Sequence, residues 1–79
     1  MEIEWDEKKN RINCEKDGIE FIDAVKLFAN DHKVKKSNYV HEERWLATGE
    51  YQGKRLTIVF TKREGKYRII SARRAKKPE

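Results

Sequence analysis

Apolar side chains recur at intervals of three and four residues between residues 20 and 30. The members of this pattern are Phe21, Ile22, Val25, Phe28 and Ala29. This spacing places all of them on one side of an α-helix. The pattern therefore predicts an amphipathic helix over residues 21–29 that packs against a hydrophobic core.

A shorter and more polar region precedes this helix. Residues 2–5 are typical of an edge strand, and Asp6 suits a helix N-cap, because its carboxylate can accept hydrogen bonds from free backbone N–H groups. The helix that follows is expected to run to about Lys16. It should stop at Gly18, since glycine adopts the left-handed conformation at little cost.

From residue 33 onward, polar and apolar side chains alternate with a period of two, which indicates β-strands. The candidate strands are a weak, polar one over Lys33–Tyr39 and stronger ones over Glu43–Tyr51, Lys54–Lys62 and Lys66–Arg73. The links Gln52-Gly53 and Glu64-Gly65 suit two-residue hairpin turns. The last three strands are therefore expected to form an antiparallel meander.

This order of elements predicts a single α+β domain over residues 1–79. We expect an N-terminal strand and two helices packed on one face of an antiparallel sheet of three or four strands, with a C-terminal helix that is short or absent. The apolar runs are too short to span a membrane, and the acidic start lacks the apolar region of a signal peptide, which indicates a cytoplasmic protein. One cysteine and two histidines cannot form an internal disulfide or a Cys/His zinc cage.

Two-residue turns would also fix which residues lie opposite one another. On the core face they predict rows of Trp45–Phe60–Ile69 and Ala47–Ile58–Ser71, with Tyr67 nearby. A bulge at either turn glycine would slip the register by one residue. The alignment of three large apolar side chains in the first row favours the unbulged count.

The opposite face of the sheet is predicted to gather arginines. Its rows would be Arg44–Thr61–Arg68 and Leu46–Val59–Ile70, with Glu42, Arg63 and Lys66 one row further out. Cross-strand neighbours lie about 5 Å apart, so Arg44 and Arg68 would flank Thr61 within roughly 10 Å of each other. Like charges in one row cost stability unless an anion or a carboxylate lies between them. This row therefore predicts a seat for a phosphate group.

Charge is distributed unevenly along the chain. Residues 1–32 carry nine acidic and five basic side chains, whereas residues 33–79 carry five acidic and fourteen basic ones, for a net charge of +5. A basic half beside an acidic half can present one face to a polyanion. This asymmetry favours nucleic acid as a ligand, although lysine and arginine also commonly solvate exposed strands.

Two groups of residues resemble the signatures of BrnT-type toxins of type II toxin–antitoxin systems. The first group is Glu4-Trp5-Asp6, Lys9, Asn13, Lys16, Gly18-Ile19, Phe21 and Ala24. The second is Arg44 to Gly49, Ile58-Val59-Phe60-Thr61, Arg63 and Arg68-Ile69-Ile70-Ser71-Ala72-Arg73-Arg74-Ala75. The resemblance covers nearly the whole chain.

This resemblance implies a bacterial toxin with a RelE-like ribonuclease fold that cleaves RNA without a metal or other cofactor. It also implies a BrnA-like, DNA-binding antitoxin as partner, a complex that represses its own operon at the operator DNA, and a dimer or a 2:2 assembly. Two features depart from the family pattern. Asp17 stands where members commonly have histidine, and the charged C-terminal helix is missing or reduced to a stub.

Metal-free RNA cleavage needs a base for the 2′-hydroxyl, an acid for the leaving oxygen, and positive charge on the phosphorane. Arginine suits the last role, because its planar fork grips phosphate oxygens and stays charged. We expect Arg44, Arg63 and Arg68 to fill it, with His41 as the candidate for proton transfer. His32, Tyr67 and Glu42 are the alternatives, and Glu42 could equally be a charge partner.

The remaining polar candidates are expected to contact RNA without chemistry. They are Thr61, Lys66, Arg73, Arg74, Lys76 and Lys77. A second reading of the same chain is a non-catalytic basic module, or a decayed toxin, that binds nucleic acid or the antitoxin. Asp17 and the short C-terminus favour this reading.

Overall fold

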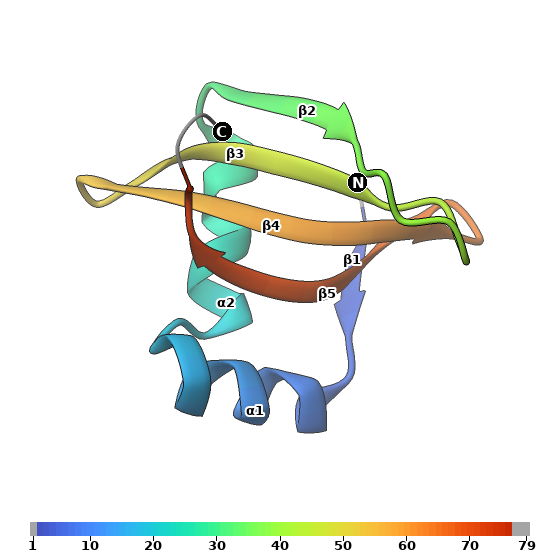
Figure 1. The fold of residues 1–79 in the computed structure, drawn as a ribbon. Helices are drawn as coiled ribbons and strands as arrows, with labels where there is room; N and C mark the ends of the chain where they lie inside the picture. The colour runs from blue at the N-terminus through green and yellow to red at the C-terminus, as the bar shows by residue number, and fades with distance from the viewer. Residues whose placement is uncertain (1, 77–79) are drawn as a thin grey trace.

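The computed structural model describes residues 2–76 and shows a mixed sheet with helices on one face (Figure 1). The elements in chain order are β1 (Ile3–Trp5), α1 (Glu7–Asp17), α2 (Phe21–Ala24), the 3₁₀ helix η1 (Val25–Ala29), β2 (His32–Lys36), β3 (Trp45–Tyr51), β4 (Lys54–Arg63) and β5 (Lys66–Arg74). The strand order is β1-β5-β4-β3-β2. The predicted α+β class is confirmed, and residues 75–76 after β5 form no helix. None of the helices within the described residues is long and apolar enough to span a membrane.

Both hairpin turns contain two residues, as the sequence predicted. Gln52 and Gly53, like Glu64 and Gly65, all have positive φ angles between 52° and 75°, which is the pattern of a type I′ turn. The meander therefore has the predicted register next to its turns. Trp45 lies opposite Phe60, and Phe60 lies opposite Ile69.

Further along β5, a bulge changes the predicted register. The shift falls between Val59 and Phe60, so that Val59 lies opposite Ser71 and Ile58 lies opposite Ala72. The predicted rows that placed Ser71 beside Ile58 and Ile70 beside Val59 were therefore wrong. The reason is one extra residue in β5, which counting outward from the turn cannot detect. The bulge lets Ile69 and Ala72 both face the core, where they are 1% and 0% exposed.

The sheet has five strands and is mixed, because the N-terminal strand joins it. The prediction was an antiparallel sheet of three or four strands. β1 lies at the edge as expected, but it pairs in parallel with β5, with Ile3 opposite Tyr67 and Trp5 opposite Ile69. β2 is shorter than its predicted strand and pairs antiparallel with β3. The predicted N-cap and stop of the first helix are confirmed, since Asp6 accepts from two backbone N–H groups and Gly18 is left-handed.

The two helices do not share one face of the sheet, which corrects the predicted packing. α2 and η1 cover one face, whereas α1 packs chiefly along the edge of β5 (Figure 1). Asn13 replaces a neighbouring strand at this edge. Its side-chain amide donates to the Ala72 carbonyl at 2.9 Å, and its carbonyl oxygen accepts from the Ala72 N–H at 3.1 Å.

The helical contribution to the core follows the predicted stripe only in part, since Val25 and Phe28 pack against the core as predicted. Phe21, Ala24 and Leu27 are fully buried, while Ile22 is 58% exposed and Ala29 lies at the surface. The cause is that the helix tightens to 3₁₀ geometry after Ala24. Side chains three residues apart then lie directly above one another. Buried residues therefore recur every three positions, and not at alternating intervals of three and four as in an α-helix.

Gly49 allows β2 to join the sheet, and its substitution should weaken that pairing. A Cβ atom at Gly49 would lie 3.0 Å from the His32 Cβ and 3.1 Å from the Asp31 carbonyl. We expect Gly49→Ala to lower the free energy of unfolding by about 1–3 kcal/mol, because the neighbouring strand must move. Urea titration would measure this change, with the exposed neighbour Glu50→Ala as control. Equal stability of the two variants would contradict the prediction.

Candidate nucleic-acid interface

The face of the sheet that α2 and η1 leave uncovered is called the open face below. Alternation along the strands places on it Leu46 and Thr48 of β3, Thr57, Val59 and Thr61 of β4, and Arg68, Ser71 and Arg73 of β5. The three threonines are at most 7% exposed, so longer side chains cover them. The hydroxyls of Thr48 and Thr57 share a hydrogen bond at 2.9 Å. The open face therefore has a satisfied polar floor beneath basic side chains.

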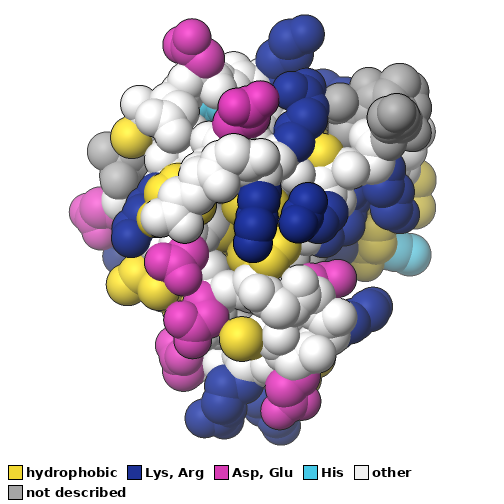
Figure 2. Space-filling view, turned by 90° about the vertical axis from the view of Figure 1, so that its left-hand side faces the viewer, with side chains coloured by type: hydrophobic (Ala, Val, Ile, Leu, Met, Phe, Trp, Pro, Cys, Tyr) yellow, Lys and Arg dark blue, Asp and Glu magenta, His cyan; other side chains and the backbone are white. Residues whose placement is uncertain are grey.

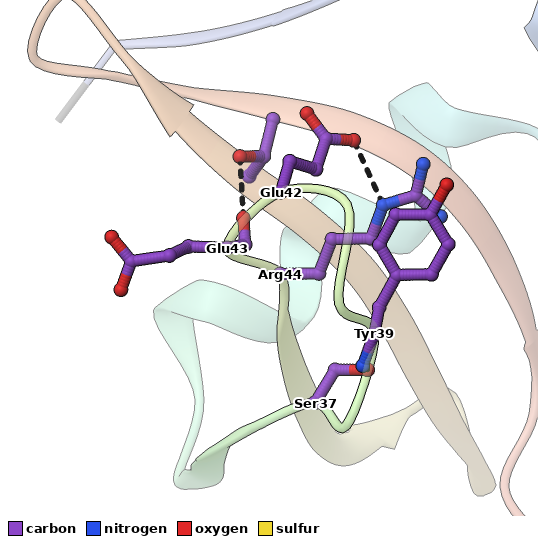
Figure 3. Close-up of polar contacts among 6 residues, drawn as sticks. Ser37, Tyr39, Glu42, Glu43 and Arg44 are labelled. Carbon is purple, nitrogen blue, oxygen red and sulfur yellow. Dashed lines mark hydrogen bonds and ion pairs between the residues drawn. The ribbon is translucent and has the colours of Figure 1, made fainter.

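Arg44 lies at one end of the open face, in the loop that joins β2 to β3. Its guanidinium carbon lies 3.8 Å from the centre of the Tyr39 ring, and its Nε donates to Glu42 Oε2 at 2.9 Å (Figure 3). The side chain is 23% exposed. Stacking on the ring and pairing with the carboxylate hold the guanidinium in one orientation.

Arg68 lies on β5 directly opposite Thr61 of β4, as the register predicted. Its Nη1 donates to Glu4 Oε2 at 2.8 Å, and its side chain is 31% exposed. Glu4 is the partner of Arg68 in the parallel pairing of β1 with β5. Lys66 adds a weaker contact, with its Nζ 3.8 Å from Glu4 Oε1.

The two carboxylates remove one reason for predicting a phosphate site, namely unbalanced repulsion between the arginines. Glu42 and Glu4 already balance the like charges of Arg44 and Arg68, so charge balance alone requires no bound anion. Each pair uses one N–H group of its arginine, however, and the other guanidinium donors are available for phosphate oxygens. The Thr61 hydroxyl donates to the Glu43 carbonyl at 2.7 Å (Figure 3) and has only its lone pairs left for a ligand.

His41 is exposed in the same loop, and its ring centre lies 5.3 Å from that of Tyr39. The structure therefore brings His41, Glu42 and Arg44 together around one aromatic ring. The alternatives for proton transfer lie elsewhere. Tyr67 packs against the core, with its ring centre 4.4 Å from that of Phe60. His32 packs against the Phe28 ring on the face that the helices cover.

The other predicted residues are spread more widely. Arg63 is exposed at the β4–β5 hairpin, opposite Lys66. Arg73 lies on the open face further along β5, whereas Arg74 lies opposite the core residue Leu56 and so belongs to the other side. Lys76 lies beyond β5, and Lys77 lies outside the described residues.

Two functional features escaped sequence analysis. One is Tyr39 as the platform for Arg44, because β2 ends at Lys36 and the loop that follows has no periodicity to place an aromatic ring. The other is Glu4 as the partner of Arg68, because the two residues are 64 positions apart. Only a parallel pairing of β1 with β5 would have indicated this contact.

Shifted pKa values belong to Asp6, Glu7 and Lys26. The backbone N–H groups of Lys8 and Lys9 lower the pKa of Asp6, and the charge of Arg68 adds to this effect. Hydrogen bonds from Asn10 and Trp5 lower the pKa of Glu7. Both shifts stabilise the start of α1. A contact with Tyr51 raises the pKa of Lys26. Within residues 2–76, no group of three or more His, Cys, Asp or Glu side chains is placed to hold a metal ion.

Lys and Arg side chains and Asp and Glu side chains both reach the surface at the β3–β4 hairpin end of the molecule (Figure 2). Figure 2 looks at the side of the molecule where the β3–β4 hairpin lies. Lys and Arg side chains extend over its centre and right, around apolar surface, and Asp and Glu side chains lie mostly towards its left. The chain as a whole carries a net positive charge, which favours a polyanion as ligand.

Comparison with known families identifies one family that matches nearly the whole chain. The family described as "Ribonuclease toxin, BrnT, of type II toxin-antitoxin system" matches residues 5–79. The chain belongs to this family of ribonuclease toxins. A search of curated proteins finds no matching relative. Membership implies RNA as the target and an antitoxin as the partner.

Proposed function

We propose that this chain is a metal-independent endoribonuclease that cleaves RNA at the end of the open face where Arg44 and Arg68 lie. The observation that carries the proposal is the arrangement of these two arginines. They come from separate segments, and each is oriented by one carboxylate while keeping other N–H donors. Preorganised donors of this kind stabilise charge that develops in a transition state.

The cleavage step uses the RNA's own nucleophile. The 2′-oxygen attacks the adjacent phosphorus while a base removes the 2′-proton. The bond between phosphorus and the 5′-oxygen then breaks, and that oxygen takes up a proton. The products are a 2′,3′-cyclic phosphate and a free 5′-hydroxyl. Arg44 and Arg68 would bind the non-bridging oxygens, and Arg63 would extend this cationic site at the β4–β5 hairpin.

His41 is the proposed proton-transfer residue. It is exposed beside the Tyr39 ring on which Arg44 stacks, so a phosphate held by Arg44 would lie near its imidazole. Imidazole exchanges protons near neutral pH, which suits both the base and the acid role. Glu42 already bonds to Arg44 and is assigned to orienting it. Lys66 would add a contact to a backbone phosphate, and the Thr61 hydroxyl oxygen, whose proton is donated to Glu43, would accept from a ribose 2′-hydroxyl.

The proposed partner is a BrnA-like, DNA-binding antitoxin that represses the operon in complex with the chain, in a dimer or a 2:2 assembly. Val40 beside the candidate site is 85% exposed, and Tyr39 is 42% exposed. An antitoxin segment that covers these apolar side chains would also cover Arg44 and His41. Inhibition would then follow from occupation of the site alone.

A single-site RNA oligonucleotide tests the mechanism. The purified chain is expected to cleave it in the presence of EDTA and to leave a 2′,3′-cyclic phosphate. A 2′-deoxy substitution at the cleavage site should abolish the reaction, since it removes the nucleophile. Expression without an antitoxin should arrest bacterial growth. Tight RNA binding without cleavage, together with harmless expression of folded protein, would instead support the non-catalytic module.

A further inference from the structure

A basic groove of about 640 Å³ lies between α1 and β5, apart from the Arg44 and His41 loop. Its polar and charged lining comes from Lys9, Lys16, Asp17, Ser71, Arg73 and Lys76. Four of these side chains are cationic and one is anionic. Its volume falls within the range of about 300–1,000 Å³ that is usual for ligand sites.

The groove exists because α1, and not β1, lies beside the second half of β5. β1 pairs with β5 only as far as Ile69, and the rest of that edge is bonded by Asn13 of α1. A helix is wider than a strand, so its side chains project above the sheet edge. Lys9 and Lys16 are seven residues apart, which places them on the same side of α1 at roughly 10 Å separation.

Neither lysine is held in an ion pair by a neighbouring carboxylate among the described residues. Among residues 2–76, Lys9 and Lys16 form no ion pair within 4.0 Å, whereas Arg44, Arg68 and Lys66 all do. Arg73 and Lys76 have partners of their own, so Lys9 and Lys16 are the groove cations that a ligand would engage. With four cationic side chains and one carboxylate in its lining, the groove has an excess of positive charge that favours a bound polyanion.

The groove also lies in line with the proposed cleavage site. Arg68 and Arg73 both point to the open face of β5 and are separated by roughly 16 Å at about 3.3 Å per residue. A stacked RNA strand advances slightly less per nucleotide than the 3.4 Å of B-DNA, so about five or six nucleotides would connect the two positions. One strand could therefore run along β5 and contact both.

We infer that this groove is a second RNA site, which binds backbone phosphates about five or six nucleotides from the cleaved bond. The inference takes its ligand from the proposed function but concerns binding, not cleavage. It assigns to Lys9 and Lys16 the role of holding longer substrates on the enzyme.

The test compares two double variants of the full chain that change the net charge equally. Lys9→Gln with Lys16→Gln removes the groove lysines, and Lys8→Gln with Arg11→Gln removes two cations from the other side of α1. The probes are fluorescein-labelled, fully 2′-O-methylated RNAs of ten and three nucleotides, which bind without being cleaved. Circular dichroism would confirm that each variant is folded. Cleavage of unmodified RNA by the unaltered chain is measured separately, so failure of the proposed function is distinguished from failure of this inference.

The groove variant is expected to bind the ten-nucleotide RNA about tenfold more weakly at low salt, whereas the control changes by less than about twofold. Its salt slope should become shallower by about 1.4, which corresponds to two lost contacts with a single strand. The loss should be confined to the longer RNA. Equal losses in both variants, or unchanged binding, would overturn the inference. Loss of antitoxin binding with RNA binding intact would assign the groove to the protein partner and overturn it too.

Discussion

Arg68→Ala is expected to lower the rate of RNA cleavage by about 100-fold. The guanidinium is held beside Thr61 by Glu4, so it can bind a phosphate oxygen without reorganising as charge develops. Removing one preorganised donor from such a site typically costs a factor of this size. Single-turnover cleavage of a defined oligonucleotide would measure it. Arg68→Lys should recover only part of the rate, because an ammonium group lacks the planar fork.

Glu4→Gln separates the chemical role of Arg68 from its structural one. This variant weakens the ion pair but keeps the guanidinium, so its rate should fall by no more than about tenfold. Both residues are about one-third exposed, so breaking their pair should cost roughly 1 kcal/mol of stability or less. Thermal unfolding would check this. Wild-type cleavage by Arg68→Ala, or an equal loss in both variants, would refute a role in transition-state stabilisation.

Asn13→Ala is expected to lower the free energy of unfolding by about 2–4 kcal/mol. The Asn13 side chain is 6% exposed and bonds three backbone groups, namely the carbonyls of Ile19 and Ala72 and the N–H of Ala72. Alanine would leave these groups without partners where water enters poorly. A domain of this size has only about 4–12 kcal/mol of total stability, so much of it would be lost.

Chemical denaturation and hydrogen exchange together would test the role of Asn13. The Ala72 amide should exchange much faster in Asn13→Ala than in the unaltered chain. Asn38→Ala, in an exposed loop, should stay within about 0.5 kcal/mol of the unaltered chain. Asn10→Ala should fall between the two, since Asn10 is buried but accepts only the Phe21 N–H from the backbone. A loss below about 1 kcal/mol for Asn13→Ala would contradict the assigned role.

Local sequence signals predicted much of the fold. Asp6, Gly18 and the two glycine-containing turns act over a few residues, and each has the expected conformation. The predicted register of β4 and β5 is correct from the turn to the bulge at Ile70. No local sequence signal indicates that bulge. The parallel pairing of β1 with β5 and the 3₁₀ geometry after Ala24 depend on contacts far along the chain. A periodicity within one segment could not predict them.

The candidate site was predictable to a similar degree. Strand alternation placed Arg68 opposite Thr61 correctly, because that pair lies close to a tight turn. It could not provide the carboxylates that orient the two arginines, since Glu4 reaches Arg68 only through β1. The α1–β5 groove was equally hidden. It needs a helix beside a strand edge, and that geometry has no signature in either segment alone.

The pairing of β1 with β5 also has a consequence for the newly made chain. The β3–β4–β5 meander contains mostly near-neighbour contacts and can form by itself, whereas β1 and α1 find their places only after β5 has left the ribosome. Before β5 is available, Glu4 cannot pair with Arg68, and the groove lacks the side that β5 forms. Nascent fragments that end before β5 therefore lack Arg68 and one wall of the groove, so neither cationic site can assemble until β5 is available.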